Sequence, residues 1–280
     1  MPELPEVETM RRGVLGLVGG RIESFEKLAC ERRPIGITPP ADTLNKRLAG
    51  LTIERIDRLG KRVLLVMEDQ SRLMFEPRMT GLVLISDPPT LEHLRVRLAI
   101  SGASHRELLY WDRRGLGSVR WFSEKQFEQE FHEGRLGPDA LDVDWNTLKN
   151  KFATTKQPVK VALLDQRRIA GIGNLYASEI LHLAKVHPAK PCHEISTQAW
   201  KRIHACMLEV LQLAIKYEGS TLNDGTYRNA LNQDGGYQNH HRVYAKEGDV
   251  CRSCGKGVIV RTVQAQRATF FCPRCQKLRR

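Results

Sequence analysis

Four cysteines near the C-terminus constrain the fold of this 280-residue chain more than any other feature. They form a C-x2-C-x17-C-x2-C pattern made of Cys251, Cys254, Cys272 and Cys275. Each pair can turn two thiolates toward one tetrahedral ion. Strand-like runs at 258–260 and 269–271 predict a hairpin between the pairs, and a segment of about 36 residues cannot bury a sufficient core alone. We therefore expect one structural Zn(II) ion. Two disulfides are the alternative, but nothing in the sequence indicates secretion.

The net charge of +12 lies entirely in the C-terminal part of the chain. Residues 1–149 carry 23 basic and 23 acidic side chains, residues 150–244 carry 12 and 7, and residues 245–280 carry 9 and 2. Four thiolates on one Zn(II) leave a formal charge of −2, so the finger stays basic with its metal bound. This asymmetry has two interpretations that the charge alone does not separate. One is a polyanionic partner held by the C-terminal half, and the other is a solvated basic tail.

Hydropathy and the N-terminus exclude several classes of protein. No apolar run reaches the roughly 18 to 20 residues of a membrane helix, and an N-terminus that opens with Pro and Glu does not resemble a signal peptide. A chain of this length with 41% hydrophobic residues can bury a large core, which excludes disorder. We expect an intracellular globular protein.

The N-terminal half shows a leading helix followed by strands. Pro5, acidic residues in the first turn and apolar residues at helical spacing predict a helix over about residues 5–18. Short runs with turn signals then predict strands at 62–67, 72–75, 82–86, 94–100, 107–111 and 118–122. Strands this frequent, with no long helices between them, predict an antiparallel sandwich.

After a loop at 134–138 the pattern becomes helical. Helices are predicted at 159–165 and 175–184, and a longer one has its apolar face between Trp200 and Ile215. The two glycines of Ile169–Asn174 let the backbone turn tightly, and the helix that follows would present N–H groups suited to a phosphate. Alone, such a motif is more often a simple turn. Glycine and asparagine in residues 218–241 predict a mobile loop.

Three motifs taken together resemble the family of formamidopyrimidine-DNA glycosylase and endonuclease VIII. They are MPELPEVET at residues 1–9, the run 169–177, and Gln266–Phe270 in the finger. The resemblance covers essentially the whole chain in order. It implies a monomer that binds damaged double-stranded DNA in the bacterial cytoplasm.

The resemblance also implies a multidomain α+β architecture that agrees with the segments above. Its parts would be an N-terminal antiparallel β-sandwich with a leading helix at 1–132, a linker at 133–149, a helix-two-turns-helix DNA-binding domain at 150–243 and a four-cysteine zinc-finger hairpin at 244–280.

The N-terminal residues explain how such a chain could act on DNA. Removal of Met1 would free the secondary amine of Pro2, whose pKa near 7.7 to 8.0 leaves a useful neutral fraction at pH 7. That amine can attack the sugar C1′, expel the base and form an iminium ion, which acidifies the C2′ proton for β-elimination and then δ-elimination. Glu3 is the candidate acid/base, and Glu6 supports proton transfer. Read alone, both carboxylates would more often compensate the helix dipole.

DNA contacts are implied at positions that match the family. Lys61 matches a phosphate-binding lysine of the catalytic site, and Asn174 and Arg267 match a pair that clamps the phosphates beside the lesion. Lys160 is a weaker candidate for the same task, and an ordinary surface charge is the favoured interpretation for it. Met79, Arg114 and Leu116 match the side chains that fill the space left by an extruded nucleotide.

The chain departs from the family pattern around these void-filling side chains. Leu116 stands where the formamidopyrimidine enzyme has Phe, Gly115 replaces an arginine, and Glu76-Pro77-Arg78 replaces His-Leu-Gly. The leading hypothesis is a bifunctional DNA glycosylase and abasic-site lyase for 8-oxoguanine and formamidopyrimidines. The alternatives are an endonuclease VIII-like enzyme for oxidised pyrimidines and a non-catalytic zinc-finger protein that binds damaged DNA.

Overall fold

A computed structural model describes residues 2–131, 135–222 and 225–278 of the chain. The chain forms two compact units: the first holds residues 1–133 and 215–238, and the second holds 134–214 and 239–280. Residues 215–238 therefore pack with the N-terminal unit, whereas the sequence placed them in the helical domain. Among the described residues, no helix is both long and apolar enough to span a bilayer.

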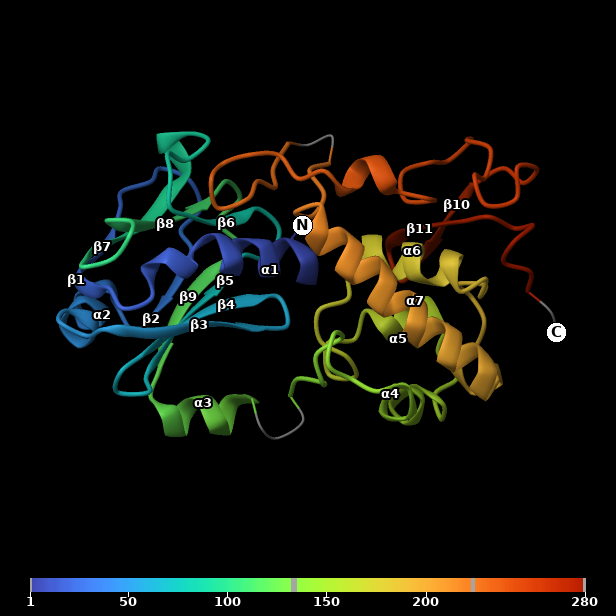
Figure 1. The fold of residues 1–280 in the computed structure, drawn as a ribbon, viewed down its shortest axis with the longest axis horizontal. Helices are drawn as coiled ribbons and strands as arrows, with labels where there is room; N and C mark the ends of the chain where they lie inside the picture. The colour runs from blue at the N-terminus through green and yellow to red at the C-terminus, as the bar shows by residue number, and fades with distance from the viewer. Residues whose placement is uncertain (1, 132–134, 223–224, 279–280) are drawn as a thin grey trace. The chain divides into compact units, whose positions relative to one another are not determined.

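The N-terminal unit is built on two β-sheets (Figure 1). The four-stranded sheet has the order β1 (Arg21–Lys27), β7 (Leu94–Ser101), β8 (Glu107–Asp112) and β6 (Gly81–Leu84). The five-stranded sheet has the order β2 (Gly36–Thr38), β9 (Ser118–Phe122), β5 (Arg72–Glu76), β4 (Arg62–Met67) and β3 (Ile53–Leu59). All neighbours are antiparallel except β2 and β9, which are parallel. The predicted sandwich is thus confirmed, with one parallel pair at an edge.

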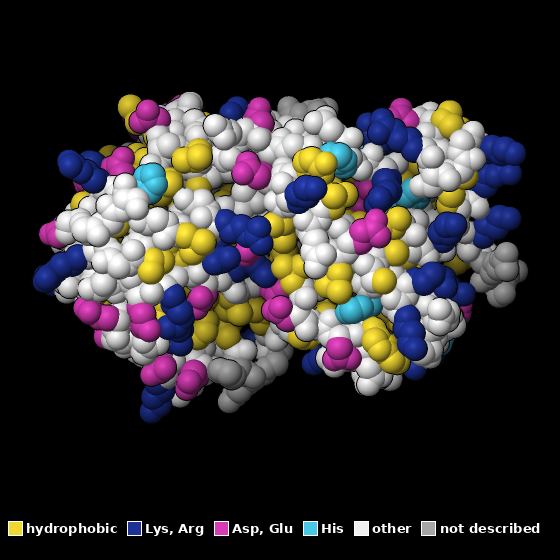
Figure 2. Space-filling view, viewed as in Figure 1, with side chains coloured by type: hydrophobic (Ala, Val, Ile, Leu, Met, Phe, Trp, Pro, Cys, Tyr) yellow, Lys and Arg dark blue, Asp and Glu magenta, His cyan; other side chains and the backbone are white. Residues whose placement is uncertain are grey.

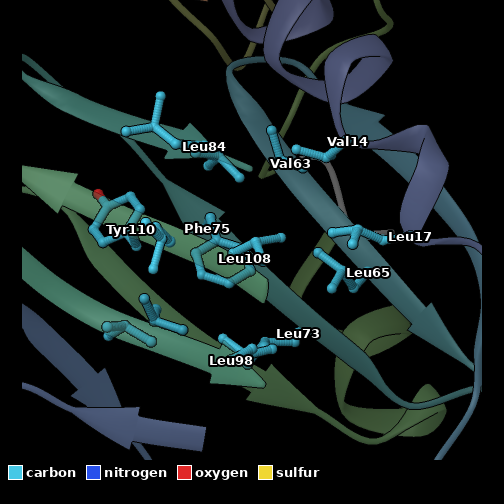
Figure 3. Packing of buried hydrophobic residues seen from close by; sticks show 14 of the residues in the cluster. Val14, Leu17, Val63, Leu65, Leu73, Phe75, Leu84, Leu98, Leu108 and Tyr110 are labelled. Atoms are coloured by element: carbon cyan, nitrogen blue, oxygen red, sulfur yellow. The ribbon is translucent and has the colours of Figure 1, made fainter. Parts of the chain in front are cut away.

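The period-two alternation of the strands produces the core between the sheets. Leu73 and Phe75 of β5 and Leu108 and Tyr110 of β8 are fully buried, and Figure 3 shows their side chains gathered together. The rings of Phe75 and Tyr110 lie 5.6 Å apart between centroids. The other face of β5 carries Met74, which belongs to a smaller apolar cluster beneath α3 (Glu124–Phe131).

The leading helix is shorter than predicted. Helix α1 spans Leu4–Gly13, and a 3-10 turn at Leu15–Leu17 follows it. The carboxylate of Glu8 in α1 forms salt bridges with Arg11 at 2.8 Å, Arg12 at 2.8 Å and Arg58 of β3 at 3.1 Å. Burial alone would raise the pKa of Glu8, but the hydrogen bonds and charges of these arginines lower it to about 2. An ionised Glu8 therefore ties the helix to the five-stranded sheet at neutral pH.

The described part of the second unit contains four α-helices and a hairpin. The helices are α4 (Trp145–Phe152), α5 (Val159–Leu163), α6 (Asn174–Leu183) and α7 (Thr197–Lys216), and the hairpin strands are β10 (Val260–Gln264) and β11 (Arg267–Phe271). Three helices lie where the sequence predicts them. Helix α4 begins inside the predicted linker, because the Asp144 side chain caps it by accepting the N–H groups of Asn146 at 2.9 Å and Thr147 at 3.1 Å.

Candidate active site

The first turn of α1 brings the N-terminal carboxylates together. Glu3 is the N-cap residue, and Glu3 and Glu6 are each only 3% exposed. Glu6 Oε2 accepts the Glu3 N–H at 2.9 Å, which is half of a capping box. Glu6 therefore stabilises the start of the helix through a hydrogen bond. The same contact fixes a carboxylate one residue away from the backbone of Pro2, and Met1 lies outside the described residues.

A distant segment completes the surroundings of Glu6. Its other oxygen, Oε1, accepts the Ser220 N–H at 2.9 Å, and the Tyr227 hydroxyl donates to the Glu218 carbonyl at 2.9 Å beside it. A Cβ at Gly219 would lie 2.9 Å from Glu6 Oε1, and Gly219 has a φ of +77°. Only glycine lets the chain pass so close to the carboxylate. Burial and the Glu6 charge raise the pKa of Tyr227, so its hydroxyl stays neutral.

Lys61 lies in the tight turn between β3 and β4. Leu59 pairs with Arg62 across this turn, and Gly60 adopts a φ of +57° that suits a two-residue hairpin loop. Lys61 itself is half-buried. The turn therefore holds the base of the lysine side chain rigidly, in the same unit as Glu3 and Glu6.

The three candidate void-filling residues lie in two neighbouring loops of the same unit. Met79 and Arg114 are exposed, and Arg114 Nη1 lies 3.1 Å from Met79 Sδ. Leu116 is half-buried two residues further along. The segment Glu76-Pro77-Arg78, where the chain departs from the family pattern, lies just before Met79. It forms part of a hydrogen-bonded turn, since the Gly81 N–H donates to the Pro77 carbonyl at 2.9 Å.

In the second unit, one side chain shapes the glycine turn before α6. Gln166 Nε2 donates to the carbonyl of Ile172 at 2.8 Å, and its Oε1 accepts the Gly171 N–H at 2.9 Å. Gly171 has a φ of +105°, a backbone region that L side chains rarely adopt. The hydrogen bonds of Gln166 thus stabilise the turn, which is followed by Asn174 at the first position of α6.

Lys160 lies beside this turn and is fully buried. Its Nζ donates to Asn174 Oδ1 and, at 3.3 Å, to the Ala268 carbonyl, while Asn174 Nδ2 donates to the same carbonyl at 3.0 Å. The interpretation of Lys160 as an ordinary surface charge is therefore wrong. The sequence could not reveal this, because Ala268 lies 108 residues away from Lys160.

Arg267 is exposed at the start of β11, directly after the hairpin turn. The turn residues Ala265 and Gln266 have positive φ values of 46° and 61°, as a two-residue hairpin turn of matching twist requires. Because Ala268 is bonded to Asn174, the hairpin and the glycine turn are held together. Figure 2 shows Lys and Arg side chains spread over the visible face of the second unit.

The four finger cysteines form one cluster. Their sulfur atoms all lie within 4.8 Å of one another, which fits a single tetrahedral ion. Backbone N–H groups of Lys256 and Gly257 lower the pKa of Cys254 to about 6, whereas burial raises the pKa of Cys272 and the pKa of Cys275. The residues present therefore fit one structural Zn(II) ion.

Comparisons with known proteins assign this arrangement to one family. Residues 1–119 match the formamidopyrimidine-DNA glycosylase N-terminal domain, residues 136–226 match its H2TH domain, and residues 248–278 match a zinc finger found in FPG and IleRS. A formamidopyrimidine-DNA glycosylase of Chloroflexus aurantiacus is 36% identical over 278 residues, which cover 99% of this chain and 98% of the relative. One from Streptococcus thermophilus is 36% identical over 282 residues, covering 99% and 100%.

Solved structures agree with this assignment over the same length. A mutant Lactococcus lactis FPG in complex with DNA containing Fapy-dG has a TM-score of 0.87 and 34% identity, covering 99% of this chain and 100% of that one. The wild-type Lactococcus lactis protein with DNA containing an oxidised pyrimidine has a TM-score of 0.85, 33% identity and the same coverage. This chain therefore belongs to the formamidopyrimidine-DNA glycosylase family.

Proposed function

We propose that the protein is a bifunctional DNA glycosylase and abasic-site lyase that removes oxidised bases from duplex DNA during base excision repair. The observation that carries this proposal is the buried Glu6 carboxylate, which accepts the N–H of Glu3, the residue after Pro2, and the N–H of Ser220. The full-length similarity to formamidopyrimidine-DNA glycosylases supports it.

The proposed reaction begins at the Pro2 nitrogen. Its lone pair attacks C1′, the glycosidic C–N bond breaks, and the base leaves with the proton that the Pro2 nitrogen loses. The C1′–O4′ bond then breaks as Glu3 protonates the ring oxygen, and the Pro2 nitrogen forms an iminium ion with C1′. The iminium ion withdraws electrons, so that Glu3, now a carboxylate, can remove a C2′ proton as the C3′–O bond breaks. A second elimination breaks the C5′–O bond. Glu6 would orient the nucleophile and assist water when the iminium is hydrolysed.

The finger and the H2TH turn would hold the DNA. Asn174 and Arg267 would contact phosphates flanking the lesion, and the buried Lys160 would hold the Asn174 side chain in place through its hydrogen bond to Asn174 Oδ1. Zn(II) bound by the four finger cysteines would supply structural stability to the hairpin that presents Arg267. The bacterial origin of the relatives favours action in the cytoplasm, where DNA of such cells is found.

Oxidised purines are the proposed substrates, with 8-oxoguanine and formamidopyrimidines as the leading cases. The relative bound to Fapy-dG DNA supports this choice. Leu116 favours the second candidate, an endonuclease VIII-like preference for oxidised pyrimidines, because it cannot stack as an aromatic ring does. The relative bound to an oxidised pyrimidine shows that such DNA can also be accommodated by a family member.

Excision rates on two duplexes separate these candidates. We expect 8-oxoguanine to be removed at least about tenfold faster than thymine glycol, a difference of about 1.4 kcal/mol in barrier height. The measurement is single-turnover excision from otherwise identical duplexes. The variant Leu116→Phe restores the aromatic side chain of the family pattern and is expected to widen the ratio. The opposite rate order would contradict the purine assignment, and no excision of either base would favour a non-catalytic DNA-binding protein.

Loss of the Arg267 guanidinium is expected to weaken binding to every duplex, with or without a lesion. Each lost phosphate contact should flatten the dependence of log Kd on log salt by about 0.9. The variant Arg267→Ala is measured by fluorescence anisotropy between low and physiological salt. Arg261→Ala is the matched control, because Arg261 is an exposed arginine on the neighbouring strand β10 that we do not assign to DNA. An identical salt slope in the two variants would contradict a phosphate contact at Arg267.

A further inference from the structure

The loops that carry Met79 and Arg114 are joined at their bases. Strands β6 and β8 pair antiparallel with Gly81 opposite Asp112, so the residues before β6 and those after β8 lie side by side. Met79 belongs to the first of these loops and Arg114 to the second. Both side chains are exposed and touch through Arg114 Nη1 and Met79 Sδ.

A buried carboxylate connects the two loops below this exposed pair. Asp112 is fully buried, and its Oδ1 accepts the Thr80 hydroxyl and, at 3.2 Å, the Arg114 N–H. Its Oδ2 accepts the Gly117 N–H at 2.8 Å. Thr80 Oγ1 in turn accepts the Arg114 N–H at 3.0 Å. The Asp112 carboxylate and the Thr80 hydroxyl thus connect Thr80, which follows Met79, to the backbone of Arg114.

The second loop has little freedom to take another shape. Gly115 has a φ of +61°, and a Cβ there would lie 2.0 Å from the Arg33 carbonyl oxygen. A Cβ at Gly117 would lie 1.9 Å from the Tyr110 hydroxyl. The buried Arg95 also donates from Nε to the Asp112 carbonyl at 2.9 Å. Both the backbone carbonyl and the side chain of Asp112 therefore accept hydrogen bonds, and these bonds fix the position of its carboxylate.

We propose that Asp112 and Thr80 are positioning residues that hold Met79 and Arg114 in one arrangement for insertion into the duplex. The proposal rests on the proposed function, since the two side chains must enter the space of one extruded nucleotide together. They come from separate loops, so each would otherwise move independently. A misplacement of about 1 Å can lower an enzymatic rate on the order of 10²-fold.

The hydrogen-bond donors around Asp112 explain why a carboxylate is needed. Three donors face its two oxygens, and an ionised carboxylate is the side chain that only accepts. An asparagine amide can accept at only one of the two oxygen positions. Its NH2 group would face either the Gly117 N–H, or the Arg114 N–H and the Thr80 hydroxyl, so at least one backbone contact of the second loop is lost in either orientation. Asp112→Asn and Thr80→Val should therefore both loosen the loop that carries Arg114, whereas Thr80→Ser keeps the connection.

The test compares two reactions of the full-length, zinc-bound protein. One is single-turnover excision from a duplex, using whichever lesion the unsubstituted protein removes fastest, and it requires void filling. The other is strand cleavage at a preformed abasic site in single-stranded DNA, which has no base stack to fill. We expect Asp112→Asn and Thr80→Val to slow the first reaction on the order of 10²-fold. The second should change by less than about threefold, and Thr80→Ser should restore the first.

Asp69→Asn is the matched control, because Asp69 also accepts the N–H two residues ahead, from Ser71 at 2.9 Å, but in a turn away from these loops. Its rates should not change. Equal slowing of both reactions by Asp112→Asn would overturn the proposal in favour of general structural damage, and so would unchanged excision. A 2-aminopurine opposite the lesion reports insertion without chemistry. Normal insertion by Asp112→Asn would overturn the proposal, whereas failure of the unsubstituted protein to cleave any substrate would refute only the proposed function.

Discussion

Replacing Pro2 with Gly is expected to abolish the covalent adduct that borohydride traps between this protein and abasic DNA. The secondary amine of proline gives an iminium ion directly, and its ring fixes the nitrogen relative to Cα. A glycine amine rotates freely, so the attack geometry beside Glu3 is lost. Removing a nucleophile commonly lowers the rate by more than about 10³-fold, and we expect at least this loss in base excision.

A second variant makes the same test without altering proline. One additional residue ahead of Pro2 places its nitrogen in an amide, which has no nucleophilic lone pair, and the adduct should again disappear. Both variants should still bind a duplex containing a reduced abasic site, because the residues that we propose to contact DNA are intact. A trapped adduct of normal yield in the extended protein would show that another amine, such as Lys61, is the nucleophile.

Replacing Cys254 with Ser is expected to release the zinc ion and to weaken DNA binding by more than about tenfold. A structural Zn(II) site contributes about 10–16 kcal/mol of apparent binding free energy to folding, and the finger has only a small apolar cluster around Val243 and Ile259 to replace it. Without the metal, the hairpin would no longer present Arg267. Zinc content by atomic absorption and affinity by anisotropy measure the two effects.

Cys206→Ser is the control for this experiment, because Cys206 is a half-buried thiol outside the cluster. It should keep one zinc ion per chain and normal affinity. Reversible removal of zinc by a chelator gives the same comparison without a substitution, and re-addition should restore binding. Full affinity in zinc-free protein would contradict a structural role for the metal.

Much of the fold could be predicted because its signals are local. Alternating side chains such as Leu94 to Ile100 mark a strand whatever its partners, and the apolar face from Trp200 to Ile215 marks a helix. Helices α2 (Ala41–Leu48) and α3 were not predicted, since each has only eight residues and its apolar side acquires meaning only against a sheet. The parallel pairing of β2 with β9 joins residues about 80 positions apart and leaves no local pattern.

The candidate site likewise contains residues with a local sequence signal and residues that only long-range contacts bring together. The finger cysteines and the N-terminal carboxylates are close in sequence, so their spacing is informative. Asp112 and Thr80, by contrast, are 32 residues apart and each resembles an ordinary turn residue. Ser220 reaches Glu6 through its backbone N–H, which any residue type except proline supplies. No pattern of side chains could have identified it.

The return of residues 215–238 to the N-terminal unit sets a time order during synthesis. Glu6 leaves the ribosome 214 residues before its partner Ser220. At about 5–20 residues per second, helix α1 waits roughly 10 to 40 s for this segment. During that interval the sandwich can fold, but the first turn of the helix lacks the Ser220 N–H and the Tyr227 hydroxyl that contact Glu6. A nascent chain therefore carries its N-terminal helix well before the surroundings of Glu6 are complete.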